Sequence, residues 1–174
     1  MLRRREIILP CILAGALACS DAPGFDVRGV RVVVETDAPF AFRQDFPARI
    51  ESTLDAALAY WGGSWEGIAG LSITLRGEQY VACGGSASSL GCYDGSIRIT
   101  TRDPGIGTFS CVEQTTLVHE IGHAVIGDRM HEDPRWMQLE PLEYALAGRV
   151  GYTLDGETEC LIWPSVWRHP LGLP

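Results

Sequence analysis

Apolar and polar side chains alternate along two short stretches of the chain, as they do in half-buried β-strands. These stretches are residues 71–76 and 96–100. A run of β-branched residues at 30–35 predicts a third strand, and a further short strand is predicted at 80–82. The pattern therefore predicts a small β-sheet.

Between the predicted strands at 30–35 and 71–76, apolar residues recur every three or four positions, which is the spacing of one helix face. Pro47 lies near the start of this segment, and Gly62-Gly63 marks the point where the helix should end. The residues of its predicted apolar face are Phe46, Ile50, Leu54, Ala57, Leu58 and Trp61.

A second helix is predicted from a capping box, with Ser110 as the N-cap and Glu113 three residues later. It should run to about residue 126, where Gly127 can end it. Its predicted buried stripe consists of Leu117, Ile121 and Val125. A third helix is predicted at 141–149, before a less regular end. This order of strand, helix, strands and helix predicts one α+β domain.

The amino terminus has the features of a bacterial export signal. Three arginines precede an apolar run at 7–18, which is too short to be a good membrane span. The run leads to Ala16-Leu17-Ala18-Cys19, which resembles a lipobox and favours lipidation of Cys19 over simple cleavage after Ala18. We therefore expect an exported protein, either a cell-envelope lipoprotein or a secreted one. The predicted segments are a signal peptide at 1–18, a tether at 19–29 and one folded domain at 30–174.

The charge of the chain argues against several kinds of partner. Its formal net charge is −8, and removal of residues 1–18, with three arginines and one glutamate, makes it −10. The chain has no lysine. An acidic domain of this kind is a poor candidate for binding nucleic acid or anionic lipid. We expect no nucleic-acid partner, membrane contact only through a lipid on Cys19, and a monomer.

Four cysteines remain after the signal segment, at positions 83, 92, 111 and 160. An even number in an exported chain predicts two disulfides, for which three connectivities exist. Cys83 and Cys92 flank a Gly/Ser-rich loop, so we favour that short closure, which leaves Cys111 to pair with Cys160. A zinc site built from thiolates would need CxxC-like spacing, which is absent.

The sequence His119-Glu120-Ile121-Gly122-His123 is an H-E-x-x-H motif within the second predicted helix. Two histidines four residues apart lie one turn apart on the same side, so both rings can bind one zinc ion. Zinc with three protein ligands keeps a position for water and lowers its pKa. Glu120 would take the proton as general base, and the hydroxide would attack a peptide carbonyl. The alternative is a pair of solvated helix histidines, but the motif has a low false-positive risk.

The residues after this motif resemble the metzincin metallopeptidases, and the matrixins most closely. Their pattern is H-E-x-x-H-x-x-G-x-x-H followed by a methionine turn. Here the segments on both sides of Gly127 are one residue longer. Asp133-Pro134-Arg135-Trp136-Met137 looks like the matrixin stretch that leads to the turn methionine. The resemblance implies that His131 is the third zinc ligand and that Met137 lies beneath the metal.

The resemblance also implies a fold and an activity. The fold would be a small twisted mixed sheet with a backing helix, a zinc-binding active-site helix and a short irregular C-terminal subdomain. In metzincins the strand before the zinc helix is an exposed edge that binds substrate as an added strand, and 96–100 occupies that place. The protein would then be an exported zinc metalloendopeptidase that acts on peptides or proteins.

Two alternatives stay open. Thermolysin-like gluzincins take their third ligand from a glutamate on a later helix, and Glu143 follows His123 by twenty residues. Glu140 is a weaker candidate, and the acidic partner that usually follows the glutamate in that family is missing. The other alternative is a non-catalytic binding lipoprotein that uses zinc only for stability. Three carboxylates close to the motif could also orient a ligand, although loop carboxylates are usually solvated; they are Asp128, Glu132 and Asp133.

Overall fold

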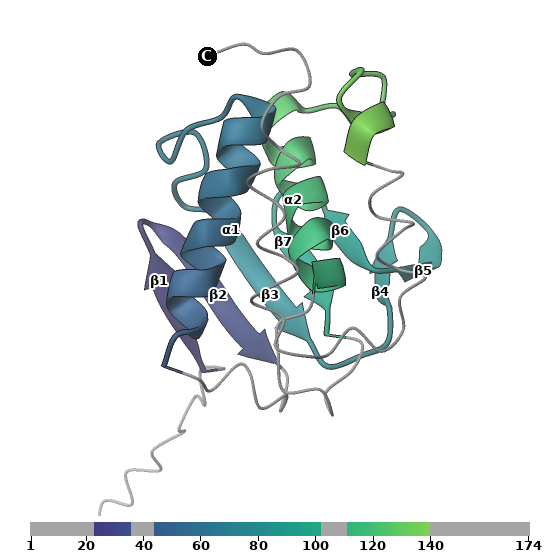
Figure 1. Cartoon of the computed structure of the whole chain (residues 1–174). Coiled ribbons are helices and arrows are strands. Elements are labelled where there is room, and N and C mark those ends of the chain that lie inside the picture. Colours follow the sequence, from purple (N-terminus) through teal and green to yellow (C-terminus); the bar gives the residue numbers. More distant parts are fainter. Residues whose placement is uncertain (1–22, 36–43, 102–110, 140–174) are drawn as a thin grey trace, which may run out of the picture.

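The computed structural model describes residues 23–35, 44–101 and 111–139, which form a mixed α+β unit (Figure 1). Two helices lie side by side across one face of a five-stranded sheet, in agreement with the predicted class. The elements in chain order are β1 (Gly24–Val27), β2 (Val30–Glu35), α1 (Phe46–Trp61), β3 (Ser72–Arg76), β4 (Val81–Cys83), β5 (Ser86–Ser89), β6 (Gly91–Tyr93), β7 (Ile97–Thr100) and α2 (Cys111–Ile126).

Three parallel strands form the centre of the main sheet. The strand order is β1-β2-β3-β7-β6, in which β2, β3 and β7 run parallel and the two outer strands are antiparallel to their neighbours. Parallel neighbours need a long crossover connection, and α1 provides it between β2 and β3. The sheet is therefore mixed, as predicted. A separate two-stranded sheet is formed by β4 and β5.

The expectation that 96–100 forms the exposed edge of the sheet is wrong. β7 pairs with β3 on one side and with β6 on the other, where Gly91 lies opposite Ile99. The chain reverses between these strands at a turn in which the N–H of Asp94 donates to the carbonyl of Ser96. Among the described residues, β6 is thus the outer strand at this end of the sheet, and β1 is the outer strand at the other end. The alternating pattern could not reveal this, because a strand with one buried face has the same pattern at either place.

The predicted apolar face of the first helix is confirmed, because all six of its side chains are buried. Gly62 ends α1 with a φ of 72°, a left-handed conformation that glycine adopts without steric cost. The face packs on the β-branched and aliphatic side chains of the central strands. The fully buried members of this core include Ile50, Leu54, Ile73, Leu75, Ile97, Ile99, Leu117 and Ile121.

The second helix agrees closely with its prediction, although the proposed N-cap, Ser110, lies outside the described residues. Leu117 and Ile121 are fully buried, whereas Val125 is only partly buried. The helix ends at Gly127, which has a φ of 69° and donates its N–H to the carbonyl of His123 at 3.1 Å. The end of α2 therefore falls between the second motif histidine and His131.

The disulfide predicted between Cys83 and Cys92 is confirmed, and it ties β4 to β6. Cys160 lies outside the described residues, as do the signal segment and the predicted helix at 141–149. The pattern missed β1, a strand within the predicted tether that forms a hairpin with β2. Among the described residues, no helix is both long and apolar enough to cross a membrane.

Candidate metal centre

Three histidines bring their ring nitrogens together at the end of α2. His119 and His123 lie one turn apart on the helix, and His131 lies on the loop that follows it. The Nε2 atom of His123 is 3.1 Å from Nε2 of His119 and 3.2 Å from Nε2 of His131. Ligand atoms from all three side chains lie within 4.8 Å of one another. The structure thus brings together the three residues that the sequence predicts as metal ligands.

This spacing suits a metal ion. Zn–N distances of about 2.0–2.1 Å and tetrahedral angles place two ligand nitrogens about 3.3 Å apart, close to the two Nε2 separations above. All three histidines are partly buried, which limits competition from bulk water. Imidazole nitrogen is a preferred ligand of zinc and of several other transition metals. These three side chains could therefore hold a metal ion.

The ring of His123 is fixed in the form that can bind a metal. Its Nδ1 atom is 2.6 Å from the main-chain carbonyl oxygen of Asp128. Because a carbonyl can only accept, Nδ1 carries the proton and Nε2 keeps its lone pair. Burial lowers the pKa of His123, although the hydrogen bond to Asp128 acts in the opposite direction. The neutral imidazole is therefore favoured at neutral pH, with Nε2 directed toward the other two histidines.

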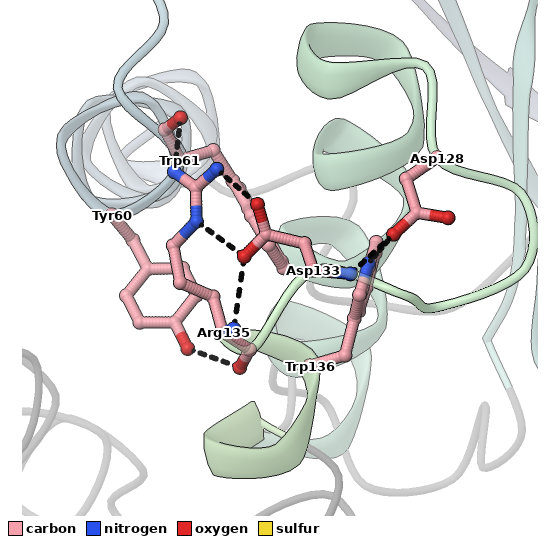
Figure 2. Close-up of polar contacts among 6 residues, drawn as sticks. All are labelled: Tyr60, Trp61, Asp128, Asp133, Arg135 and Trp136. Atoms are coloured by element: carbon pink, nitrogen blue, oxygen red, sulfur yellow. Dashed lines mark hydrogen bonds and ion pairs between the residues drawn. The ribbon is translucent and has the colours of Figure 1, made fainter.

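The carboxylate of Asp128 organises the loop after the helix. It accepts hydrogen bonds from the main-chain N–H groups of Met130 and Asp133, at 3.0 and 2.8 Å. It also accepts one from Nε1–H of Trp136 at 2.9 Å, and Figure 2 shows this contact beside the one from Asp133. These hydrogen bonds hold the pKa of Asp128 below its usual value, the bond from Asp133 having the largest effect. Asp128 is thus ionised at neutral pH.

An aromatic ring, that of Trp136, packs against all three histidines. Its centroid is 4.7 Å from that of His119, 4.8 Å from that of His123 and 4.4 Å from that of His131. The side chain is 1 % exposed, whereas Met137 is 78 % exposed. The expectation that Met137 lies beneath the metal position is therefore wrong. Residues 136–139 form one helical turn in which Trp136 and Leu139 share the buried side, so Met137 faces outward.

A second carboxylate, Asp133, anchors the loop to α1 through Arg135 (Figure 2). Arg135 donates from Nε and Nη2 to the carboxylate of Asp133, at 2.8 and 2.7 Å. Its Nη1 donates to the carbonyl of Trp61 at 2.7 Å, and its own carbonyl accepts from the hydroxyl of Tyr60 at 2.6 Å. The hydrogen bond from Arg135 lowers the pKa of Asp133 to about 2, and burial raises the pKa of Tyr60 to about 12. The loop that carries His131 is thus attached to α1 through both Trp61 and Tyr60.

Glu120, the predicted general base, is 5 % exposed and lies against the backbone of β6. A Cβ atom added at Gly91 would be 2.5 Å from Oε1 of Glu120 and 2.7 Å from Cγ2 of Thr116. The absence of a side chain at position 91 therefore leaves room for the Glu120 carboxylate. Because Cys92 is the next residue, the disulfide secures the strand that forms this wall.

The sequence motifs identify the three histidines and Glu120, but they do not identify the groups that pack around them. Trp136 lies within the matrixin-like stretch, where the resemblance implies a role for Met137 and none for Trp136, and Gly91 belongs to no recognisable pattern. Asp128 has a signal, because aspartate after a helix end often accepts a main-chain N–H two residues later, as it does from Met130. The alternative third ligands Glu140 and Glu143 lie outside the described residues.

Comparisons with protein-family models, curated proteins and solved structures found no match to this chain.

Proposed function

We propose that this protein is an exported, zinc-dependent metalloendopeptidase of the metzincin type. The observation that carries the proposal is the convergence of the Nε2 atoms of His119, His123 and His131. Glu120 follows the first of these histidines directly, as the general base does in H-E-x-x-H peptidases. A structural zinc site is normally closed by four protein ligands, whereas the group found among the described residues has three.

Each of these side chains has a role in the proposed reaction. The three histidines would hold zinc through Nε2, and the ion, when bound, would supply the lowered pKa of the attacking water and the polarisation of the peptide carbonyl. A carboxylate oxygen of Glu120 accepts a proton from the attacking water. Glu120 then passes this proton to the amide nitrogen as the C–N bond breaks. The water oxygen remains in the new carboxyl group, so one peptide bond and one water molecule give two chain ends.

Two features of the structure support this assignment of roles. The Glu120 carboxylate lies against β6, which restricts its rotation before substrate binds. β6 is also one of the two outer strands of the main sheet among the described residues, and a sheet edge can bind an extended peptide as an added strand. A substrate that paired with β6 would lie next to Glu120.

The experiment that tests the proposal is cleavage of a diverse peptide mixture by the purified exported chain, with products identified by mass spectrometry. We expect the zinc-loaded wild type to cleave and chelation to stop it. Glu120→Gln should keep its zinc and lose cleavage, because the amide cannot accept the proton. If zinc-loaded wild type and Glu120→Gln both left every peptide intact, the protein would instead be a zinc-stabilised binding lipoprotein or would act on a single partner.

The third ligand needs a separate comparison. In a chelator competition, His131→Ala should lose tight zinc binding, because only two of the three histidines of the centre, His119 and His123, would remain. Glu143→Ala should bind zinc as the wild type does. The reverse result would assign the protein to the gluzincin type, with Glu143 as the ligand.

A further inference from the structure

One carboxylate, that of Asp128, closes the loop that carries His131. Three of its hydrogen-bond donors are the N–H of Met130, the N–H of Asp133 and the Nε1–H of Trp136. The two main-chain donors lie on opposite sides of His131 in the sequence. The third donor belongs to the ring that packs against all three histidines. Asp128 therefore joins the loop that carries His131 to Trp136, the ring that packs against the three histidines.

The main-chain carbonyl of Asp128 forms a hydrogen bond with a second histidine, His123. The carbonyl of Asp128 accepts the Nδ1–H of His123 at 2.6 Å, which directs Nε2 of that ring toward the other two. Asp128 thus supports His123 through its carbonyl, and it supports His131 through the loop that its carboxylate closes. Neither contact requires Asp128 to bind a metal. Among the described residues, the group that could hold a metal ion consists of the three histidines, without Asp128.

The conformation of His131 makes this support necessary. Its φ is 57°, in the left-handed region that residues with a Cβ atom adopt only at a steric cost. Such a conformation persists where the surrounding contacts enforce it. Without the Asp128 carboxylate, the loop would lose the hydrogen bonds on both sides of His131. The backbone could then relax and carry Nε2 of His131 away from Nε2 of His123.

We propose that Asp128 is a positioning residue that sets the zinc affinity of the centre without being a ligand. This inference rests on the proposed metal centre. Loss of a residue that orients metal ligands typically weakens metal binding 10–100-fold. Asp128→Asn keeps the size of the side chain but replaces one acceptor oxygen with an NH2 group, so at least one of the three hydrogen bonds is lost. It should weaken zinc binding about 10–100-fold.

The test is a competition for zinc between the exported chain and a chromophoric chelator. Glu132→Gln is the matched control, because Glu132 is the exposed one of the three loop carboxylates, and the change removes the same charge next to His131. His131→Ala provides the reference for a centre that has lost one ligand. Cobalt absorption spectra of the same proteins report the set of ligands, and circular dichroism of the metal-free proteins reports folding.

The expected result is wild-type affinity for Glu132→Gln, within about threefold, and the 10–100-fold loss for a folded Asp128→Asn. The cobalt spectrum of Asp128→Asn should shift toward that of His131→Ala, which a general loss of stability would not produce. Zinc affinity and cobalt spectrum equal to those of Glu132→Gln would overturn the proposal.

If Asp128→Asn failed to fold, Trp136→Phe would decide, because it removes the Nε1–H donor to Asp128 and leaves an aromatic ring, although a smaller one, against the three histidines. Weaker zinc binding by Trp136→Phe would support the proposal, and unchanged binding would overturn it. A failure of the proposed function is recognised separately. A folded wild type that bound no zinc would remove the metal centre itself, whereas zinc binding by the wild type with equal binding by Asp128→Asn would remove only the role of Asp128.

Discussion

Gly122, the residue before the second motif histidine, is subject to two opposing effects that can be separated by one substitution. Alanine is favoured over glycine within a helix by about 1 kcal/mol, so propensity alone predicts that Gly122→Ala stabilises α2. The surroundings predict the opposite. An added Cβ atom would be 2.6 Å from Cε2 of Trp61 and 2.7 Å from Cη2 of Trp136, which is closer than carbon atoms approach.

Neither ring can move away easily. The side chains of Trp61 and Trp136 are 2 % and 1 % exposed, and their Nε1–H groups donate to the carbonyl of Val118 and to Asp128. Overpacking of a buried site typically costs about 1–3 kcal/mol, and two fixed rings favour the upper end of this range. After subtraction of the helix-propensity gain, we expect a net loss of about 2 kcal/mol in the free energy of unfolding. For a domain of this size that lowers Tm by about 4–8 °C.

The assay is thermal unfolding of the metal-free protein in excess chelator, so that changes in zinc affinity do not contribute. Ala124→Gly, two residues further along the same helix, is the control for helix propensity and should lower Tm by about 2–4 °C. A Gly122→Ala protein with unchanged or raised Tm would refute the packing argument, because propensity would then outweigh the contacts with the two rings.

Three further predictions concern the base, the loop and the metal. Gly91→Ala should lower kcat for peptide cleavage about tenfold or more with zinc affinity unchanged, because the three atoms nearest to the added Cβ atom belong to Glu120 and Thr116, and the Glu120 carboxylate would be displaced. The measurements are kcat and a chelator titration, and an equal loss of zinc binding would contradict the prediction. The pKa of Asp133 is about 2 in the folded protein, below the value of about 3.9 for a free side chain, so its stabilising contribution is complete above about pH 4 and is lost as the pH falls toward 2. The Tm difference between wild type and Asp133→Asn should therefore shrink as thermal melts move from pH 6 to pH 3, and a constant difference would argue against the ion pair with Arg135. Zinc at a hundred times the Kd of the wild type should stabilise the wild type by about 2.7 kcal/mol, which raises its Tm by about 5–11 °C. A thermal shift of the same size in His131→Ala at the same zinc concentration would exclude that histidine as a ligand.

The helices of this protein could be predicted because burial of one helix face requires apolar residues at regular spacing, and this spacing is visible in the sequence. Six apolar residues between Phe46 and Trp61 recur every three or four positions, and all six side chains are buried, as predicted. The order of the strands could not be predicted in the same way. β6 contains only Gly91, Cys92 and Tyr93, which is too short to alternate, and its pairing with β7 depends on the turn between them. Local sequence does not encode which strand becomes the outer one.

The candidate site likewise has residues that local spacing predicts and residues that depend on tertiary contacts. The two α2 histidines meet because helix geometry fixes side chains four residues apart, and this could be predicted from the motif alone. The resemblance led to His131, whose Nε2 is within reach of the others only through the loop closed by Asp128. It also led to Met137, which faces outward while Trp136 fills the space beneath the rings. Packing of a large ring with a hydrogen-bonded Nε1–H depends on tertiary contacts, and no spacing rule reveals it.

The most direct test of the metal centre is a crystal structure of the zinc-loaded chain with anomalous scattering recorded at the zinc absorption edge. We expect one anomalous peak about 2.0–2.1 Å from Nε2 of His119, His123 and His131, with a water or substrate group as the remaining ligand. A zinc ion bound by a fourth protein side chain would indicate a structural zinc site. A peak out of reach of His131, or no peak between these histidines, would contradict the proposed metal centre.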